Sequence, residues 1–136
     1  MGRVSETNVD VVRRLFRRFG EGGIEAALDG LHEDLVIEIP PDLSAEPDTY
    51  HGHDGARRYF SGFAGTVEDL RYEALEVVPA GEHVLAAVRL SGRGVSSGID
   101  TELRVVVLHA LRDGKVVYIR PYPDMESARE AAGQAG

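Results

Sequence analysis

The chain of 136 residues contains no cysteine, and Lys115 is its only lysine. Without cysteine, disulfides, thiolate metal sites and cysteine nucleophiles are all excluded. The sequence also lacks a long apolar run, which argues against a signal peptide or a membrane span. The near-complete use of arginine in place of lysine is typical of a GC-rich bacterial genome. These absences predict a cytoplasmic bacterial protein.

Positive charge is scarce as well, and the net charge is -8. A surface of this sign repels phosphate backbones, which argues against a nucleic-acid partner. The one basic cluster is "RRLFRRF", and helical spacing places its four arginines on one side of a helix. A solvated helix face explains this cluster better than a binding patch. The length fits one domain, predicted to span residues 1–136.

Helical spacing of apolar residues predicts four helices. The first begins near Thr7, which can cap it, and ends at the glycines between 20 and 23. A short second helix covers residues 24–31, and a third runs from His53 or Asp54 to Phe63. The fourth covers residues 124–133 near the C-terminus.

Strand patterns fill most of the remaining sequence. Residues 34–41 alternate and end at a pair of prolines, and residues 41–49 read as a loop. Four longer runs, rich in valine and leucine, follow at 70–78, 83–92, 101–112 and 115–122. Asp113 and Gly114 are a strong hairpin signal between the last two. The order predicts an α+β fold in which helices cover one face of a curved antiparallel sheet.

The segment "HGHD" at 51–54 invites a metal interpretation, which the rest of the sequence does not support. An aspartate at a helix start caps free backbone N–H groups, so Asp54 needs no metal to explain it. The remaining histidines, His32, His83 and His109, fall on separate elements. The glycines of "GRGVSSG" lie between two strands, without the helix that a dinucleotide site requires. We therefore expect no metal and no cofactor.

Four segments carry a family resemblance: "YHGHDGARRYF", "SGRGVSSGID", "LHALRDGKVV" and "RPYPDMESAREAAG". In this order and spacing, the chain resembles the SnoaL-like branch of the nuclear transport factor 2-like superfamily. The resemblance implies a cone, in which a strongly bent antiparallel sheet wraps three helices of the N-terminal half around a pocket. A short C-terminal helix completes it. Members of the superfamily include polyketide cyclases, ketosteroid isomerase and limonene epoxide hydrolase.

The resemblance does not carry the isomerase chemistry with it. The position that matches the isomerase base is Ile39. The positions of its two oxyanion donors are Leu15 and Leu108. None of these three side chains is polar.

The epoxide hydrolase chemistry is also incomplete. Its arginine matches Arg89, but its two carboxylate positions are Ser91 and Pro121. Neither residue can act as a general base as a carboxylate does. If Arg89 faces into the cone, an apolar surrounding makes an unpaired charge expensive. Its partner is then either a carboxylate of the protein or a polar group of a ligand.

Strand alternation extends this assignment to the neighbouring residues. With Arg89 inward, the inner face also includes Leu85, Ala87, Ser91, Val106, Leu108, Ala110, Val117, Ile119 and Pro121, joined by Ile37 and Ile39. The predicted pocket residues are Leu15, Phe16, Phe19, Ile37, Ile39, Tyr50, Tyr59, Phe60, Phe63, Arg89, Ser91, Leu108, Ala110, Ile119 and Pro121.

The alternate strand positions, which would then face outward, are also apolar. An antiparallel sheet with one face in water should show polar residues there. A two-fold partner would cover such a face, which predicts a homodimer through the outer face of the sheet. The positions are Val84, Ala86, Val88, Leu90, Val105, Val107, His109, Leu111, Val116 and Tyr118.

These observations predict a small-molecule-binding protein whose apolar pocket holds a hydrophobic metabolite, such as a polyketide-like or other cyclic compound. Two alternatives stay open. The first is an enzyme of the cyclase, isomerase or epoxide hydrolase type that uses unusual acid–base residues, with Tyr50, Tyr59 or His53 as candidates. The second is a structural dimerisation domain.

Overall fold

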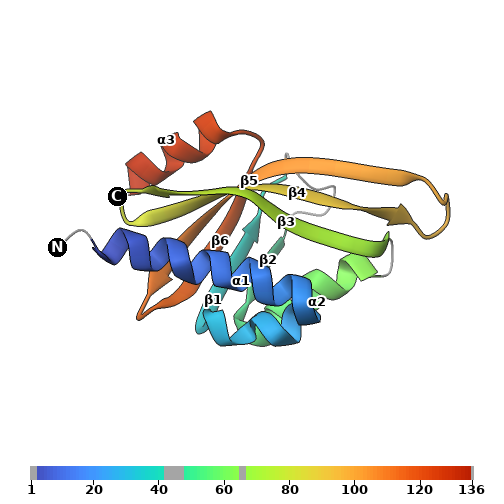
Figure 1. The fold of residues 1–136 in the computed structure, drawn as a ribbon, viewed down its shortest axis with the longest axis horizontal. Coiled ribbons are helices and arrows are strands. Elements are labelled where there is room, and N and C mark those ends of the chain that lie inside the picture. The colour runs from blue at the N-terminus through green and yellow to red at the C-terminus, as the bar shows by residue number, and fades with distance from the viewer. Residues whose placement is uncertain (1–2, 42–47, 65–66, 136) are drawn as a thin grey trace.

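The computed structural model describes residues 3–41, 48–64 and 67–135 (Figure 1). Within these ranges, no helix is both long and apolar enough to cross a membrane. The elements in chain order are α1 (Arg3–Ala27), a short 3-10 turn (Leu28–Gly30), β1 (Leu31–Ile39), β2 (Asp48–His51), α2 (Gly52–Ala64), β3 (Val67–Ala80), β4 (His83–Gly94), β5 (Asp100–Arg112), β6 (Lys115–Tyr122) and α3 (Met125–Ala135).

The described strands form one six-stranded sheet in the order β2-β1-β6-β5-β4-β3. Its second half is the predicted antiparallel meander, β3 to β6. The turn at Asp113 and Gly114 has positive φ at both residues, 55° and 75°, as the hairpin signal predicts. The sheet as a whole is mixed, because β1 pairs in parallel with β6. The predicted fold class, a curved sheet with helices in an α+β arrangement, is confirmed.

The first two predicted helices form one kinked element. Helix α1 begins at Arg3 rather than at Thr7, and it continues past the glycines to Ala27. The kink lies at Gly23, whose φ of 73° and ψ of -160° are not helical. Only glycine adopts this conformation without steric cost. The kink lets the last turn of α1 change direction and lead into β1.

The edge strand β2 falls partly where the sequence predicted a loop at 41–49. Most of that predicted loop lies outside the described residues. Strand β2 pairs antiparallel with β1, with Tyr50 opposite Ile37. Helix α2 follows at once and begins at Gly52, one residue before His53 and two before Asp54, the two predicted starts.

The sheet is covered by helices on both faces. Figure 1 shows α1 and α2 on one side of the sheet and α3 on the other. The larger core lies on the inner side, where α1 and α2 pack on the sheet. A second, smaller core lies on the outer side, where Ala128 and Ala132 of α3 pack on Leu85, Val106 and Leu108.

This two-sided covering corrects the predicted orientation of β4 and β5. Val84, Ala86, Val88 and Val107 were predicted to face outward, but they belong to the inner core with α1. Leu85, Val106 and Leu108 face α3 instead. Both faces are apolar because the chain covers both of them, so alternation of polarity could not separate inside from outside. The homodimer stays a prediction, but it loses the argument on which it was based.

Gly23 and Gly20 form a matched pair for testing the kink. Gly23→Ala should lower the free energy of unfolding by about 1–3 kcal/mol, because alanine is strained at this positive φ. Gly20→Ala should raise it by about 0.5–1 kcal/mol, since Gly20 lies in the helix with open space around its Cα. Urea unfolding measures both changes. Equal effects of the two substitutions would contradict the assigned kink.

Candidate functional site

An apolar cavity of about 170 Å³ lies between the inner face of the sheet and helices α1 and α2. Leu103 on β5 lines the cavity and is 50% exposed, so we place the opening of the cavity beside it. In the described part of the chain, no charged side chain lines it. The lining residues are Leu15, Phe16, Phe19, Ile24, Ala27, Leu31, Ile37, Ile39, Tyr59, Phe60, Tyr72, Leu90, Leu103, Val105, Val107, His109, Ile119 and Pro121.

Aromatic side chains from three elements build one wall of the cavity. Phe16 of α1 stacks on Tyr72 of β3, with ring centroids 5.2 Å apart. The ring centroids of Phe19 on α1 and Phe60 on α2 lie 4.8 Å apart, and both rings contact the ring of Tyr72. Tyr59 packs edge-on against Phe60 at 5.0 Å. Large flat rings in such contacts fill space and separate the helices from the sheet.

His109 is the most deeply buried polar residue of the cavity wall, with 1% of its surface exposed. Its Nδ1 lies 3.3 Å from the backbone oxygen of Val84, its neighbour on β4. A carbonyl oxygen only accepts, so Nδ1 carries the proton and donates it. Burial lowers the pKa of His109 to about 4, and hydrogen bonding to backbone carbonyls opposes this only in part. The ring is therefore neutral at pH 7, and Nε2 is left with its lone pair.

Two tyrosines also place side chains on the cavity wall. Burial, with a smaller effect of Tyr50, raises the pKa of Tyr59 to about 12. Burial, with a smaller effect of Tyr59, also raises the pKa of Tyr72 far above its usual range. Both hydroxyl groups stay protonated at neutral pH and can donate or accept a hydrogen bond. The wall thus combines an apolar surface with three neutral polar side chains.

The structure brings together most, but not all, of the residues predicted for the pocket. Tyr50 packs beside the cavity wall, 5.3 Å from Tyr59 and under the guanidinium of Arg58. The side chain of Phe63 lies outside the described part of the chain. The predicted residues that line the cavity are Leu15, Phe16, Phe19, Ile37, Ile39, Tyr59, Phe60, Ile119 and Pro121.

Besides Tyr50, four predicted pocket residues do not line the cavity: Arg89, Ser91, Leu108 and Ala110. Arg89 points away from the inner face and donates to Glu73, directly opposite on β3, at 3.2 Å. The prediction that Arg89 faces inward is therefore wrong, and a protein carboxylate partners it. Where β5 pairs with β6, Ala110 lies opposite Tyr118 and Leu111 opposite Val116, so β6 has an extra residue at 117 and Val107 is aligned with inward-facing Pro121. Bulges of this kind reverse the face on which the following residues lie.

The positions that the family resemblance matched to catalytic groups place no acid or base in this cavity. Leu15, Ile39 and Pro121 do line it, whereas Leu108 faces α3. His53, one of the candidate acid–base residues, lies outside the lining and contacts the backbone oxygen of Leu31 through Nε2 at 2.8 Å. Of the three candidates, only Tyr59 is part of the wall.

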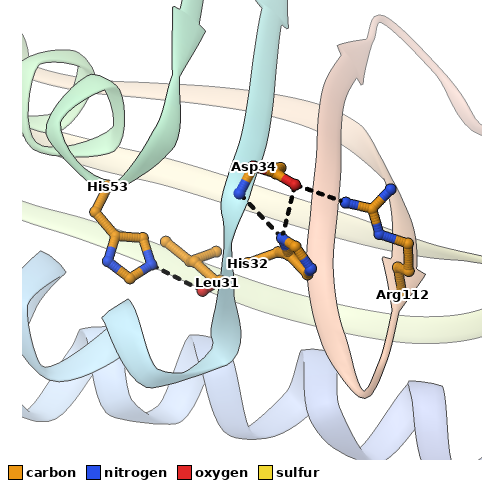
Figure 2. Close-up of polar contacts among 5 residues, drawn as sticks. All are labelled: Leu31, His32, Asp34, His53 and Arg112. Atoms are coloured by element: carbon orange, nitrogen blue, oxygen red, sulfur yellow. Dashed lines mark hydrogen bonds and ion pairs between the residues drawn. The ribbon is translucent and has the colours of Figure 1, made fainter.

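The "HGHD" segment joins the start of α2 to the start of β1 (Figure 2). Besides the contact of His53 with Leu31, Nδ1 of His32 accepts the backbone N–H of Asp34 at 3.0 Å. The carboxylate of Asp34 pairs with Arg112 at 3.0 Å. Figure 2 shows these contacts as two separate groups along β1. Among the described residues, no group of three histidine or acidic side chains could hold a metal ion.

Asp54 lies inside the first turn of α2, which begins at Gly52, and not at the predicted cap position. Its carboxylate pairs with Arg57 at 2.7 Å, and Arg57 also pairs with Glu25 of α1. The pair with Glu25 ties the start of α2 to the last turn of α1. These exposed ion pairs position the two helices that border the cavity.

Sequence reasoning missed the polar residues that matter most in the cavity. His109 was assigned to the outer face, and Tyr72 was not considered. The signal for His109 is a single histidine inside the apolar run "VVVLHAL", which reads as a buried strand. Tyr72 alternates with charged Arg71 and Glu73, and this pattern alone places it on the buried face.

Comparison with protein families gives one match: the SnoaL-like domain family covers residues 12–119. No curated protein matches the sequence significantly.

Several solved structures share the fold. A nuclear transport factor 2-like protein from Burkholderia xenovorans LB400 is 29% identical, with a TM-score of 0.71 over 94% of this chain and 97% of that one. A putative SnoaL-like polyketide cyclase from Jannaschia sp. CCS1 is 20% identical, with a TM-score of 0.75 over 97% and 95%. TerC, co-crystallised with polyporic acid, is 21% identical, with a TM-score of 0.71 over 93% and 98%.

Burial of neutral His109 should make stability depend on pH. The unfolded chain binds the proton near pH 6.5, whereas the folded protein binds it only near pH 4. Between these values the unfolded state holds more protons, so the free energy of unfolding falls as the pH falls through this window. At about 1.4 kcal/mol per pKa unit, the loss is about 3 kcal/mol.

Urea unfolding from pH 7 to pH 4 measures this loss. His109→Leu should remove most of the pH dependence, whereas His51→Gln, at an exposed histidine, should leave it in place. If the free energy of unfolding depended on pH in the same way in wild type and His109→Leu, His109 would not be the buried neutral group assigned here.

Proposed function

Because the chain belongs to the SnoaL-like domain family, we propose that it binds a small, hydrophobic, cyclic molecule in the cavity between α1 and the inner face of the sheet. The observation that carries this proposal is the cavity itself. Its wall is formed by aliphatic and aromatic side chains with few polar groups, which is the usual composition of a small-molecule site.

The volume limits the size of the ligand. An apolar cavity of about 150 Å³ in another protein stays dry and accepts benzene. The cavity of about 170 Å³ in this protein therefore fits one ring with small substituents. A compound of several fused rings would need the opening beside Leu103 to widen. The ligand is thus a compact cyclic metabolite rather than a large polyketide.

Binding is favoured over acid–base catalysis by the chemistry of the wall. At the positions that the resemblance matches to carboxylates of the superfamily enzymes, this chain has Ile39, Ser91 and Pro121. The described wall has no carboxylate, and its one imidazole, His109, is a weak base because burial lowers its pKa to about 4. Such a wall is poorly suited to abstract a proton from carbon or to activate water at pH 7. The similar fold of TerC, which was co-crystallised with polyporic acid, supports the use of this architecture for binding.

Two measurements test the proposal. Native mass spectrometry of the purified protein should detect a bound molecule of low mass. Calorimetric titration with single-ring compounds should give saturable binding with one site per chain. A negative change in heat capacity should accompany it, since apolar surface is buried. The absence of a co-purified ligand together with no binding of any ring compound would contradict the proposal.

Leu103 and Leu75 allow a matched test of the cavity as the binding site. Both are about half exposed, at 50% and 48%, but only Leu103 lines the cavity. Leu103→Trp places a larger side chain at the opening and should weaken binding of a single-ring ligand at least about tenfold, which is about 1.4 kcal/mol. Leu75→Trp should leave the affinity unchanged. Equal affinities of both variants and wild type, measured by calorimetry, would place the site elsewhere.

Arg89 provides a second test, because a polar group of the ligand was one of the two partners expected for it. It pairs with Glu73 on the outer face, and the two side chains are 35% and 43% exposed. Arg89→Leu should therefore leave ligand affinity unchanged and change the free energy of unfolding by about 1 kcal/mol or less. Calorimetry and urea unfolding measure the two quantities. A large loss of affinity in this variant would show that the pair acts on the cavity.

A further inference from the structure

His109 gives the cavity a chemical preference that its apolar wall alone does not. The residue lies on β5 in the inner wall, and its ring stands edge-on to Phe16 with centroids 5.8 Å apart. Its Nδ1 is directed to the backbone of the adjacent strand β4. In an imidazole, Nδ1 is the nitrogen nearer the main chain and Nε2 is the more distant one. The tip of the ring therefore points away from the sheet, into the layer between sheet and α1.

The contact with Val84 fixes which nitrogen can interact with a ligand, and how. Nδ1 donates to the backbone oxygen of Val84, and the backbone of Val107 also takes part in the hydrogen bonding of the ring. A neutral imidazole has one proton, and with this proton on Nδ1 the Nε2 nitrogen carries only a lone pair. Nε2 can then only accept a hydrogen bond. The hydroxyl groups of Tyr59 and Tyr72 differ from it, because each can either donate or accept. The imidazole is thus the one polar group of the described wall that requires a donor from its partner.

Resting on the proposed function, we propose that the ligand is an uncharged single-ring compound that carries a hydroxyl or N–H group, and that this group donates to Nε2 of His109. A phenol or an alicyclic alcohol fits this description. A carboxylate does not, because it only accepts and would bring an uncompensated charge into an apolar cavity. An ether or a simple hydrocarbon fits the volume but leaves the buried acceptor without a partner.

Three probes of similar size separate the hydrogen bond from the fit of the ring. Toluene presents only the ring, phenol adds a donor, and anisole keeps the oxygen without its hydrogen. We use calorimetry or ligand-detected NMR with wild type and with His109→Phe, which keeps a flat ring at this position. The quantity of interest is the ratio of the phenol affinity to the toluene affinity in each protein. A change in how the cavity packs against the aromatic ring of the probe affects both affinities and cancels in this ratio.

The ratio should fall about tenfold from wild type to His109→Phe, the loss expected of one hydrogen bond. The ratio of anisole to toluene should stay the same in both proteins. An unchanged phenol ratio would overturn the role of His109 while leaving cavity binding intact. If neither toluene nor phenol binds to wild type, the proposed function fails instead, so the two outcomes are distinguishable.

A spectroscopic measurement on the wild type covers the case in which His109→Phe does not fold. In protein labelled with ¹⁵N at histidine, the Nε2 resonance of His109 should move towards the shift of a hydrogen-bonded acceptor on addition of phenol. Toluene and anisole should leave it in place. The same Nε2 shift with all three probes, or with none of them while they bind, would overturn the inference.

Discussion

The packing of α1 on the inner face of the sheet is the contact on which the rest of the molecule depends. Its apolar stripe supplies buried Val12, Leu15 and Phe16, and the ring of Phe16 stacks on Tyr72 of the edge strand β3. Large aromatic side chains from α1, α2 and β3 meet there and form one wall of the cavity. Aliphatic side chains of β1 and β5, such as Ile37 and Val105, line it from the sheet. The cavity is thus a result of the same packing that holds the fold together.

The sequence was sufficient to predict the elements and the family fold, because periodicity and turn residues are local signals. The meander from β3 to β6 and its hairpin at Asp113 and Gly114 follow from such signals. The parallel pairing of β1 with β6 does not, because it depends on segments far apart in the chain. The kink at Gly23 shows the same limit. A run of glycines predicts a helix end, yet here the helix changes direction and continues.

The candidate site was predicted only in part, and the errors have one physical origin. On β4 and β5 both faces are apolar, since α1 covers one and α3 covers the other. Alternation of polarity then does not show which face of a strand is the inner one. The inner face was instead assigned from Arg89, which was placed inward by its match to the arginine of the epoxide hydrolases. Arg89 in fact forms a partly exposed pair with Glu73, and the opposite parity brings His109 into the cavity wall. On β1 and α1, only one face is apolar, and the residues predicted there, such as Ile37 and Leu15, do line the cavity.

The position of β1 in the sheet has a consequence for the order in which the chain folds. Its outer-face contacts join residues far apart, as in the pair of Glu38 and Arg120, which are separated by 82 positions. The strands from β3 to β6 are joined by short connections and pair with their sequence neighbours. Closing a long loop costs more entropy than closing a short one, and contacts between distant residues slow folding. We therefore expect the C-terminal meander to form first and β1 to join it by parallel pairing with β6. During synthesis, the cavity wall formed by β1 can be completed only after β6 has left the ribosome.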